Sequence, residues 1–202
     1  TSNAITLTNS TLQGNSAYDD GAGIKLDSTV AYVENTRFIA NTGAVDGGAM
    51  HVDYGSSVTL VSSTFAQNIV TDEGGAIYFY SGASMLVITA TNFLSNTEIG
   101  SGGAVYLYKD GASADSLFQN NQTDLNGGAV YNRSALRVEN STFYSNTAQK
   151  GGGVYNNAVF TVTNVTFAAN TGTNGSGIFN NSGKTLYLRN SLIAGSMTGA
   201  DC

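Results

Sequence analysis

A pair of glycines returns along this chain about every 25 residues, and this period constrains the fold more than any other feature. The pair opens a motif of the form Gly-Gly-Ala-aliphatic, or a close variant of it. Its first glycine lies at Gly21, Gly47, Gly74, Gly102, Gly127, Gly151 and Gly175. A second motif, usually Phe-x-x-Asn, keeps the same period and begins at Leu12, Phe38, Phe65, Phe93, Phe118, Phe143 and Phe167, with an eroded copy at Ile193. Two independent motifs at one period indicate a repeat architecture.

Apolar residues alternate within each repeat as they do in β-strands. Five and seven residues before the phenylalanine, the chain places residues such as Leu60 and Val58, which point to one side of a strand. A unit of about 25 residues with short strands cannot bury its own apolar face, but stacked units can. The sequence therefore predicts an all-β fold, a right-handed parallel β-helix of about eight coils, with residues 1–202 as a single repeat domain.

One repeat departs from this alternation. Before Phe118 the two positions are Gly111 and Ser113, and we expect a bulge or a slack turn there.

Each repeated position then becomes a column along the solenoid. The phenylalanines are expected to stack inside, and the paired glycines mark a sharp corner that disfavours a Cβ atom. The asparagine three residues after each phenylalanine is expected to form a hydrogen-bonded ladder at another corner. A second, partial ladder is predicted from Asn9, Asn35, Asn140, Asn164 and Asn190.

Composition excludes several classes of function. Only eight residues are Lys or Arg and the net charge is −6, so a nucleic-acid partner is not expected. No apolar run reaches the length of a membrane span. The single cysteine, Cys202, excludes an internal disulfide. The single histidine, His51, has no Gly-His-Gly context and is predicted to lie on the surface.

The motif pairs "DGGAM…FAQN", "EGGAI…FLSN" and "NGGAV…FYSN" resemble the passenger region of the chlamydial polymorphic outer-membrane proteins and related bacterial surface β-helix repeat proteins. The resemblance covers essentially the whole chain. It implies a secreted or surface-displayed solenoid that acts as an adhesin or a structural spacer.

Carboxylates precede the glycine pair in the first three repeats, at Asp20, Asp46 and Glu73. Stacked carboxylates repel each other, and a calcium ion would relieve the repulsion. Asp20 and Glu73 would also lie ~10 Å apart, near the separation that inverting glycosidases use. Three interpretations stay open: a solvated acidic turn, which we favour, a calcium site, and a catalytic pair. No other cofactor is predicted.

Aromatic residues follow the Gly-Gly-Ala-aliphatic motif at positions that alternation turns outward. They are Tyr78, Tyr80, Tyr106, Tyr108, Tyr131, Tyr155 and Phe179. In-register stacking of strand-forming residues explains such a stripe, and so does a recognition face for a glycan, a protein or another copy of the chain.

The sequence thus predicts a non-enzymatic extracellular adhesion or structural module of a bacterial surface protein. The main alternative is a carbohydrate-active β-helix enzyme, either a polysaccharide lyase or a hydrolase, that uses the acidic column. A further alternative is a subunit of an extracellular fibre that associates head to tail, because the predicted terminal coils carry no recognisable cap. We therefore expect these residues to be part of a longer chain or of an assembly.

Overall fold

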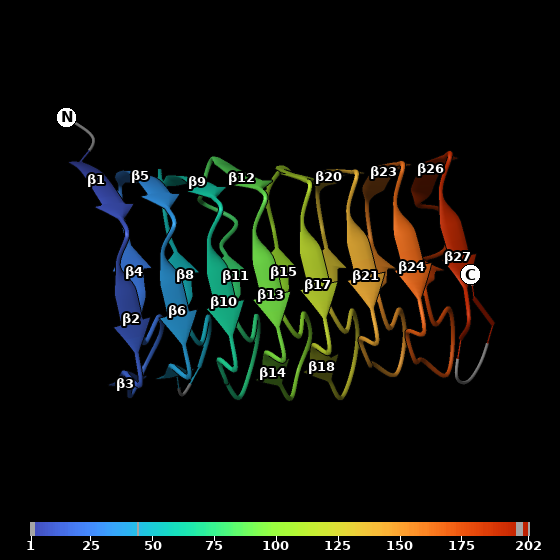
Figure 1. Ribbon diagram of the computed structural model, residues 1–202, viewed down its shortest axis with the longest axis horizontal. Helices are drawn as coiled ribbons and strands as arrows, with labels where there is room; N and C mark the ends of the chain where they lie inside the picture. The colour runs from blue at the N-terminus through green and yellow to red at the C-terminus, as the bar shows by residue number, and fades with distance from the viewer. Residues whose placement is uncertain (1–2, 44, 197–199, 202) are drawn as a thin grey trace.

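The computed structural model describes residues 3–43, 45–196 and 200–201, and Cys202 lies outside these ranges. Three long parallel sheets run side by side along the molecule from the N-terminal to the C-terminal end (Figure 1). Successive strands of each sheet come from successive repeats. Two sheets have eight strands and the third has seven, so the chain completes about seven turns of a parallel β-helix. The predicted fold class is confirmed.

The first sheet contains, in spatial order, β1 (Asn3–Thr8), β5 (Thr29–Glu34), β9 (Ser57–Val61), β12 (Met85–Thr89), β16 (Gly111–Ala114), β20 (Ala135–Glu139), β23 (Val159–Thr163) and β26 (Thr185–Arg189). The second contains β2 (Thr11–Gln13), β6 (Arg37–Ile39), β10 (Thr64–Ala66), β13 (Asn92–Leu94), β17 (Leu117–Gln119), β21 (Thr142–Tyr144), β24 (Thr166–Ala168) and β27 (Leu192–Ala194).

The third sheet contains β4 (Ile24–Leu26), β8 (Met50–Val52), β11 (Ile77–Phe79), β15 (Val105–Leu107), β19 (Val130–Asn132), β22 (Val154–Asn156) and β25 (Ile178–Asn180). Two short pairs close a corner: β3 (Ser16–Ala17) with β7 (Thr42–Gly43), and β14 (Thr97–Glu98) with β18 (Gln122–Thr123). Within the described ranges, no helix is long and apolar enough to cross a membrane.

The phenylalanine column forms the centre of the core. Phe65 pairs in register with Phe38 on one side and Phe93 on the other. Adjacent rings of this column lie 4.5–5.1 Å apart between centroids and are nearly parallel. All of them are buried, so each ring contributes both apolar burial and an aromatic contact with its neighbours.

The asparagine ladder beside this column is also confirmed. The side-chain oxygen of Asn96 accepts hydrogen bonds from the backbone N–H and the side-chain amide of Asn68, at 3.1 and 2.9 Å. Its own amide donates to the carbonyl of Phe65 and to Asn121, at 2.9 and 3.0 Å. Every polar group of this buried side-chain amide is therefore paired. The amide also provides hydrogen bonds to backbone groups of the turn that would otherwise be unpaired in the core.

The second asparagine ladder is present on the exposed side, where Asn35 donates to Asn9 at 2.6 Å and Asn190 donates to Asn164 at 2.6 Å. A buried ladder of hydroxyl groups was not predicted. There the backbone N–H of one coil donates to the Ser or Thr side chain of the next, as from Thr36 to Ser63 at 3.2 Å. Its signal in the sequence is a Ser or Thr two positions before each phenylalanine of the column except Phe167, which has Val165 there.

The glycine corner has the predicted geometry. Gly74 has a φ of 69°, a left-handed conformation that suits glycine. A Cβ atom on Gly103 would lie 2.1 Å from the carbonyl oxygen of Gly128 in the next coil. The first glycine is therefore required by the backbone angle and the second by the close approach of coils.

The expectation of a bulge at Gly111 and Ser113 is wrong. β16 stays in register with both neighbours, so that Gly111 pairs with Leu86 and Leu136, and Ser113 pairs with Val138. The small side chains leave an apolar cavity of about 20 Å³ instead of changing the strand. The strand keeps its parallel hydrogen bonds because their loss would leave buried backbone groups unpaired.

Glu98 is a buried acid at the corner formed by β14 and β18. The residue is 2% exposed, and neither carboxyl oxygen has a hydrogen-bond partner among the described residues. Burial raises the pKa of Glu98 to about 8 from its usual 4.5, because a buried carboxylate loses its hydration.

We expect Phe93→Ala to lower the free energy of unfolding by about 3–5 kcal/mol, because the variant leaves a cavity in the middle of the phenylalanine column. Tyr144→Ala, at an exposed position of β21 in the same sheet, is the control and should cost much less. Urea denaturation of both variants measures the difference. Equal losses would contradict the assignment of the two faces.

Glu98→Gln should make stability less dependent on pH. The folded protein keeps the Glu98 proton up to about pH 8, whereas the unfolded chain releases it near 4.5, so unfolding releases a proton between these values and wild-type stability falls as pH rises through this window. The variant has no such loss. Urea denaturation measures the difference in unfolding free energy between variant and wild type. From pH 5 to pH 8 this difference should shift in favour of the variant by a few kcal/mol, since one pKa unit corresponds to about 1.4 kcal/mol. An unchanged difference would show that Glu98 is ionised in the folded state.

Candidate functional site

Two columns of side chains meet on the outer side of the third sheet. One column consists of the residues that precede the glycine pair, and isolated bridges join Asp46 to Glu73 and Glu73 to Ser101 in successive coils. The other consists of the central residues of the third-sheet strands, where His51 pairs with Tyr78 and Tyr78 with Tyr106. The predicted register of both columns is therefore confirmed.

The acidic column is not a fully solvated turn, because Asp20, Asp46 and Glu73 are all half-buried. Burial, followed by the charges of neighbouring carboxylates, of which Glu73 is the strongest, raises the pKa of Asp46 to about 7. Burial also raises the pKa of Glu73, and hydrogen bonds to its carboxylate from Tyr106 and Tyr78 oppose that rise. The three carboxylates are thus less solvated than the favoured interpretation of an acidic turn assumed.

His51 is buried as well, which corrects its predicted place on the surface. The side chain is only 6% exposed. Its Nδ1 atom lies 3.5 Å from Asp20 Oδ2, and its Nε2 atom lies 3.9 Å from Asp53 Oδ2. Burial lowers the pKa of His51, which favours the neutral ring. The residue faces away from the core as predicted, but neighbouring side chains cover it.

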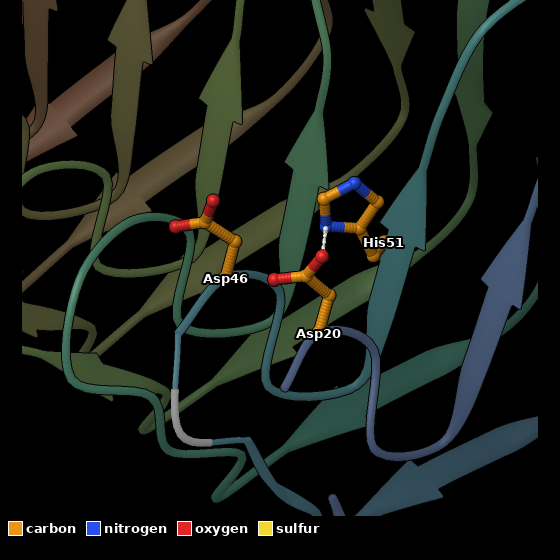
Figure 2. Close-up of side chains that lie close together, drawn as sticks. All are labelled: Asp20, Asp46 and His51. Carbon is orange, nitrogen blue, oxygen red and sulfur yellow. Dashed lines mark ion pairs between the residues drawn. The ribbon is translucent and has the colours of Figure 1, made fainter. Parts of the chain in front are cut away.

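The carboxylates and His51 gather at one place (Figure 2). Asp20, Asp46 and His51 each offer one ligand atom, and these atoms lie within 4.8 Å of one another. Glu73 is outside this cluster, so the predicted calcium set of Asp20, Asp46 and Glu73 is only partly brought together. His51 was missed as a partner because a single histidine in a strand carries no metal-binding spacing of its own.

The tyrosine column stacks as predicted. Ring centroids lie 5.5 Å apart for Tyr78 and Tyr106, 4.7 Å for Tyr106 and Tyr131, and 4.9 Å for Tyr131 and Tyr155. Phe179 ends the stack, 5.1 Å from Tyr155. Such offset, in-register contacts stabilise parallel strands.

These rings do not all face water, however. Tyr78, Tyr106 and Tyr155 are buried, whereas Tyr131 and Phe179 are half-buried. The rings between the two ends of the stack are covered above and below by their neighbours, and the flank of Tyr106 is covered by Tyr108, 5.1 Å away between centroids. Burial strongly raises the pKa of Tyr78 and of Tyr106. The expectation of an exposed stripe is therefore wrong for the buried members of this column.

The accessible aromatic surface is smaller and includes a residue that the repeat did not indicate. Tyr54 is 58% exposed, and its hydroxyl lies 3.1 Å from that of Tyr80, with the two rings edge to face. Tyr80 and Tyr108 are half-buried. Arg133 lies over the Tyr108 ring at 4.4 Å and donates to its hydroxyl at 2.6 Å. Tyr54 lies in the turn after β8, outside both columns, so only the structure reveals it.

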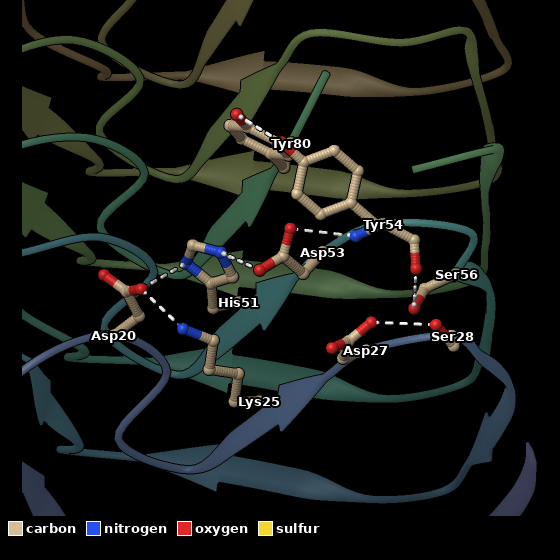
Figure 3. Close-up of polar contacts among 9 residues, drawn as sticks. All are labelled: Asp20, Lys25, Asp27, Ser28, His51, Asp53, Tyr54, Ser56 and Tyr80. Carbon is tan, nitrogen blue, oxygen red and sulfur yellow. Dashed lines mark hydrogen bonds and ion pairs between the residues drawn. The ribbon is translucent and has the colours of Figure 1, made fainter. Parts of the chain in front are cut away.

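An open groove joins the acidic cluster to these tyrosines (Figure 3). It has a volume of about 230 Å³ and is lined by Asp20, Asp46, His51, Asp53, Tyr54, Tyr78 and Tyr80. At the edge of the groove, Lys25 forms an ion pair with Asp20 at 2.8 Å. The groove thus combines hydrogen-bond acceptors with aromatic surface.

Comparison with known proteins agrees with this architecture. Residues 1–201 match the family model described as the right handed beta helix region. No curated protein and no solved structure matches the sequence. Because the match spans almost the whole chain and the strands form about seven turns of a parallel β-helix, the chain belongs to the right-handed β-helix family.

Proposed function

We propose that this chain is a non-enzymatic adhesion or structural module of an extracellular bacterial surface protein, and that it binds a glycan in the groove beside Tyr54 and Tyr80. The observation that carries the proposal is this open groove, which is lined by both carboxylates and tyrosines. The resemblance of the repeats to chlamydial passenger regions supports a secreted or surface location.

The chemistry of the groove suits a sugar. The carboxylates of Asp20 and Asp53 can accept hydrogen bonds from sugar hydroxyls, and the Tyr54 and Tyr80 rings offer apolar surface to the C–H face of a sugar ring. Exposed tyrosines also act as anchors in protein recognition, so a protein ligand is the second outcome of the binding test. Self-association from end to end stays a prediction.

One observation favours the alternative of a carbohydrate-active enzyme. A carboxyl group whose pKa is about 7, as at Asp46, suits a general acid. Asp20 offers a second carboxylate within 4.8 Å of it. Asp20 and Asp46 are therefore a second pair that such an enzyme could use, beside the predicted Asp20 and Glu73.

The double variant Tyr54→Ala/Tyr80→Ala should lose glycan binding by at least about tenfold, because anchors of this kind carry much of the binding free energy. A glycan array identifies a bound glycan, and calorimetry then compares the affinities. Tyr187→Ala is the matched control, since this tyrosine is 61% exposed but lies on β26, far along the solenoid from the groove.

Two outcomes would contradict the proposal. Equal binding by the wild type and the double variant would place the ligand elsewhere. Cleavage of acidic or neutral oligosaccharides by the wild type, lost in Asp46→Asn, would make the chain an enzyme.

A further inference from the structure

The Asp20, Asp46 and His51 cluster has a feature that a solvated acidic turn lacks, which is a buried ring nitrogen without a hydrogen bond. The Nδ1 atom of His51 is fully covered and has no hydrogen-bond partner among the described residues. It is directed at Asp20, whose Oδ2 atom lies 3.5 Å away (Figure 2). An unpaired buried polar atom is costly, so this nitrogen calls for a ligand.

The other ring nitrogen has a different environment. Nε2 of His51 faces the Asp53 carboxylate at 3.9 Å (Figure 3). A metal ion on Nδ1 would leave the ring proton on Nε2, where it faces the Asp53 carboxylate. Histidines that bind metals commonly have such a carboxylate behind the ring, where it fixes the tautomer and the orientation.

Charge in the cluster is also poorly balanced. Asp46 Oδ1 accepts one hydrogen bond, from the backbone N–H of Glu73 at 3.1 Å, while the carboxylates of Glu73, Asp72 and Asp20 surround it. Lys25 supplies a positive charge, but it binds only Asp20 and its side chain is 44% exposed. A cation between Asp20 and Asp46 would lower the repulsion that the stacked coils impose.

We propose that Asp20, Asp46 and His51 bind one divalent transition-metal ion of the Zn²⁺ type. One atom from each residue lies within 4.8 Å of the others, so modest side-chain rotation brings all three to metal–ligand distance. An imidazole nitrogen with two carboxylates suits Zn²⁺ and its neighbours in the first transition row. Calcium, in contrast, takes oxygen ligands, so the histidine changes the predicted class of metal.

The site would keep a free coordination position. Three protein ligands leave a four-coordinate Zn²⁺ one position for water or another group, and the cluster forms part of the wall of the open groove. The ion would thus place a Lewis-acidic point beside Tyr78 and Tyr80. Metal binding does not depend on the proposed glycan, so each can fail without the other.

The test uses purified, untagged protein treated with a chelator and then titrated with ZnCl₂. Calorimetry should show one equivalent bound. His51→Ala and Asp46→Asn should each weaken binding by at least about tenfold, the lower end of what even outer-sphere changes cost at metal sites. Glu73→Gln is the matched control: it removes a nearby negative charge but no ligand, so it should weaken binding much less than either ligand variant. Lys25→Met should raise the affinity about two- to fivefold, because it removes an exposed competing ion pair.

A measurement on the wild type keeps the test valid if a variant fails to fold. The chain has a single histidine, so both ¹⁵N imidazole resonances belong to His51, and their couplings to the ring protons distinguish Nδ1 from Nε2. Zn²⁺ should shift the Nδ1 resonance and leave Nε2 protonated. CaCl₂ should leave the Nδ1 resonance unshifted. Absence of this shift at one equivalent of Zn²⁺, or binding that His51→Ala does not weaken, would overturn the proposal.

Discussion

In-register parallel stacking is the constraint on which the rest of this molecule depends. Each coil places its residues against the same positions of the next coil, at the ~4.8 Å spacing of hydrogen-bonded strands. A side chain that interacts well with its own kind is therefore favoured at every position of its column. Phenylalanine rings stack, as Phe65 does between Phe38 and Phe93, and asparagine amides form continuous chains, as from Asn68 to Asn96. The same constraint keeps β16 in register even where Gly111 and Ser113 leave a cavity.

Charged residues of the same sign are tolerated least in this arrangement, because in-register stacking places them next to one another. The acidic column continues only from Asp20 through Asp46 to Glu73, and Ser101 follows in the next coil. The three carboxylates have different partners: Asp20 pairs with the Lys25 ammonium, tyrosine hydroxyls donate to Glu73, and Asp46 accepts a hydrogen bond from the backbone N–H of Glu73. Burial and the neighbouring carboxylates raise the pKa of Asp46 to about 7, so a cation bound beside it would offset a repulsion that the β-helix leaves in place.

Much of the fold could be predicted because it follows from periodicity. Alternation separates Ile77 and Phe79, which face the core, from Tyr78, which faces outward. Alternation does not tell whether an outward side chain is covered by its neighbours, and this is why the burial of Tyr78 and His51 was missed. Coverage depends on side chains from the adjacent column and from adjacent coils, such as Tyr108 beside Tyr106. Tyr54 could not be placed either, since it lies in a turn whose length varies among the repeats.

Departures from a column are informative in a solenoid because repetition alone already provides stability. His51 stands between Lys25 and Tyr78 in the third sheet, where another tyrosine would extend the stack that runs to Phe179. A buried histidine with an unpaired nitrogen is a poorer structural choice at this position. Tyr54 likewise departs from the repeat, and both residues line the same groove. The ligands proposed for this groove would account for both departures, one of which leaves a buried nitrogen without a hydrogen bond.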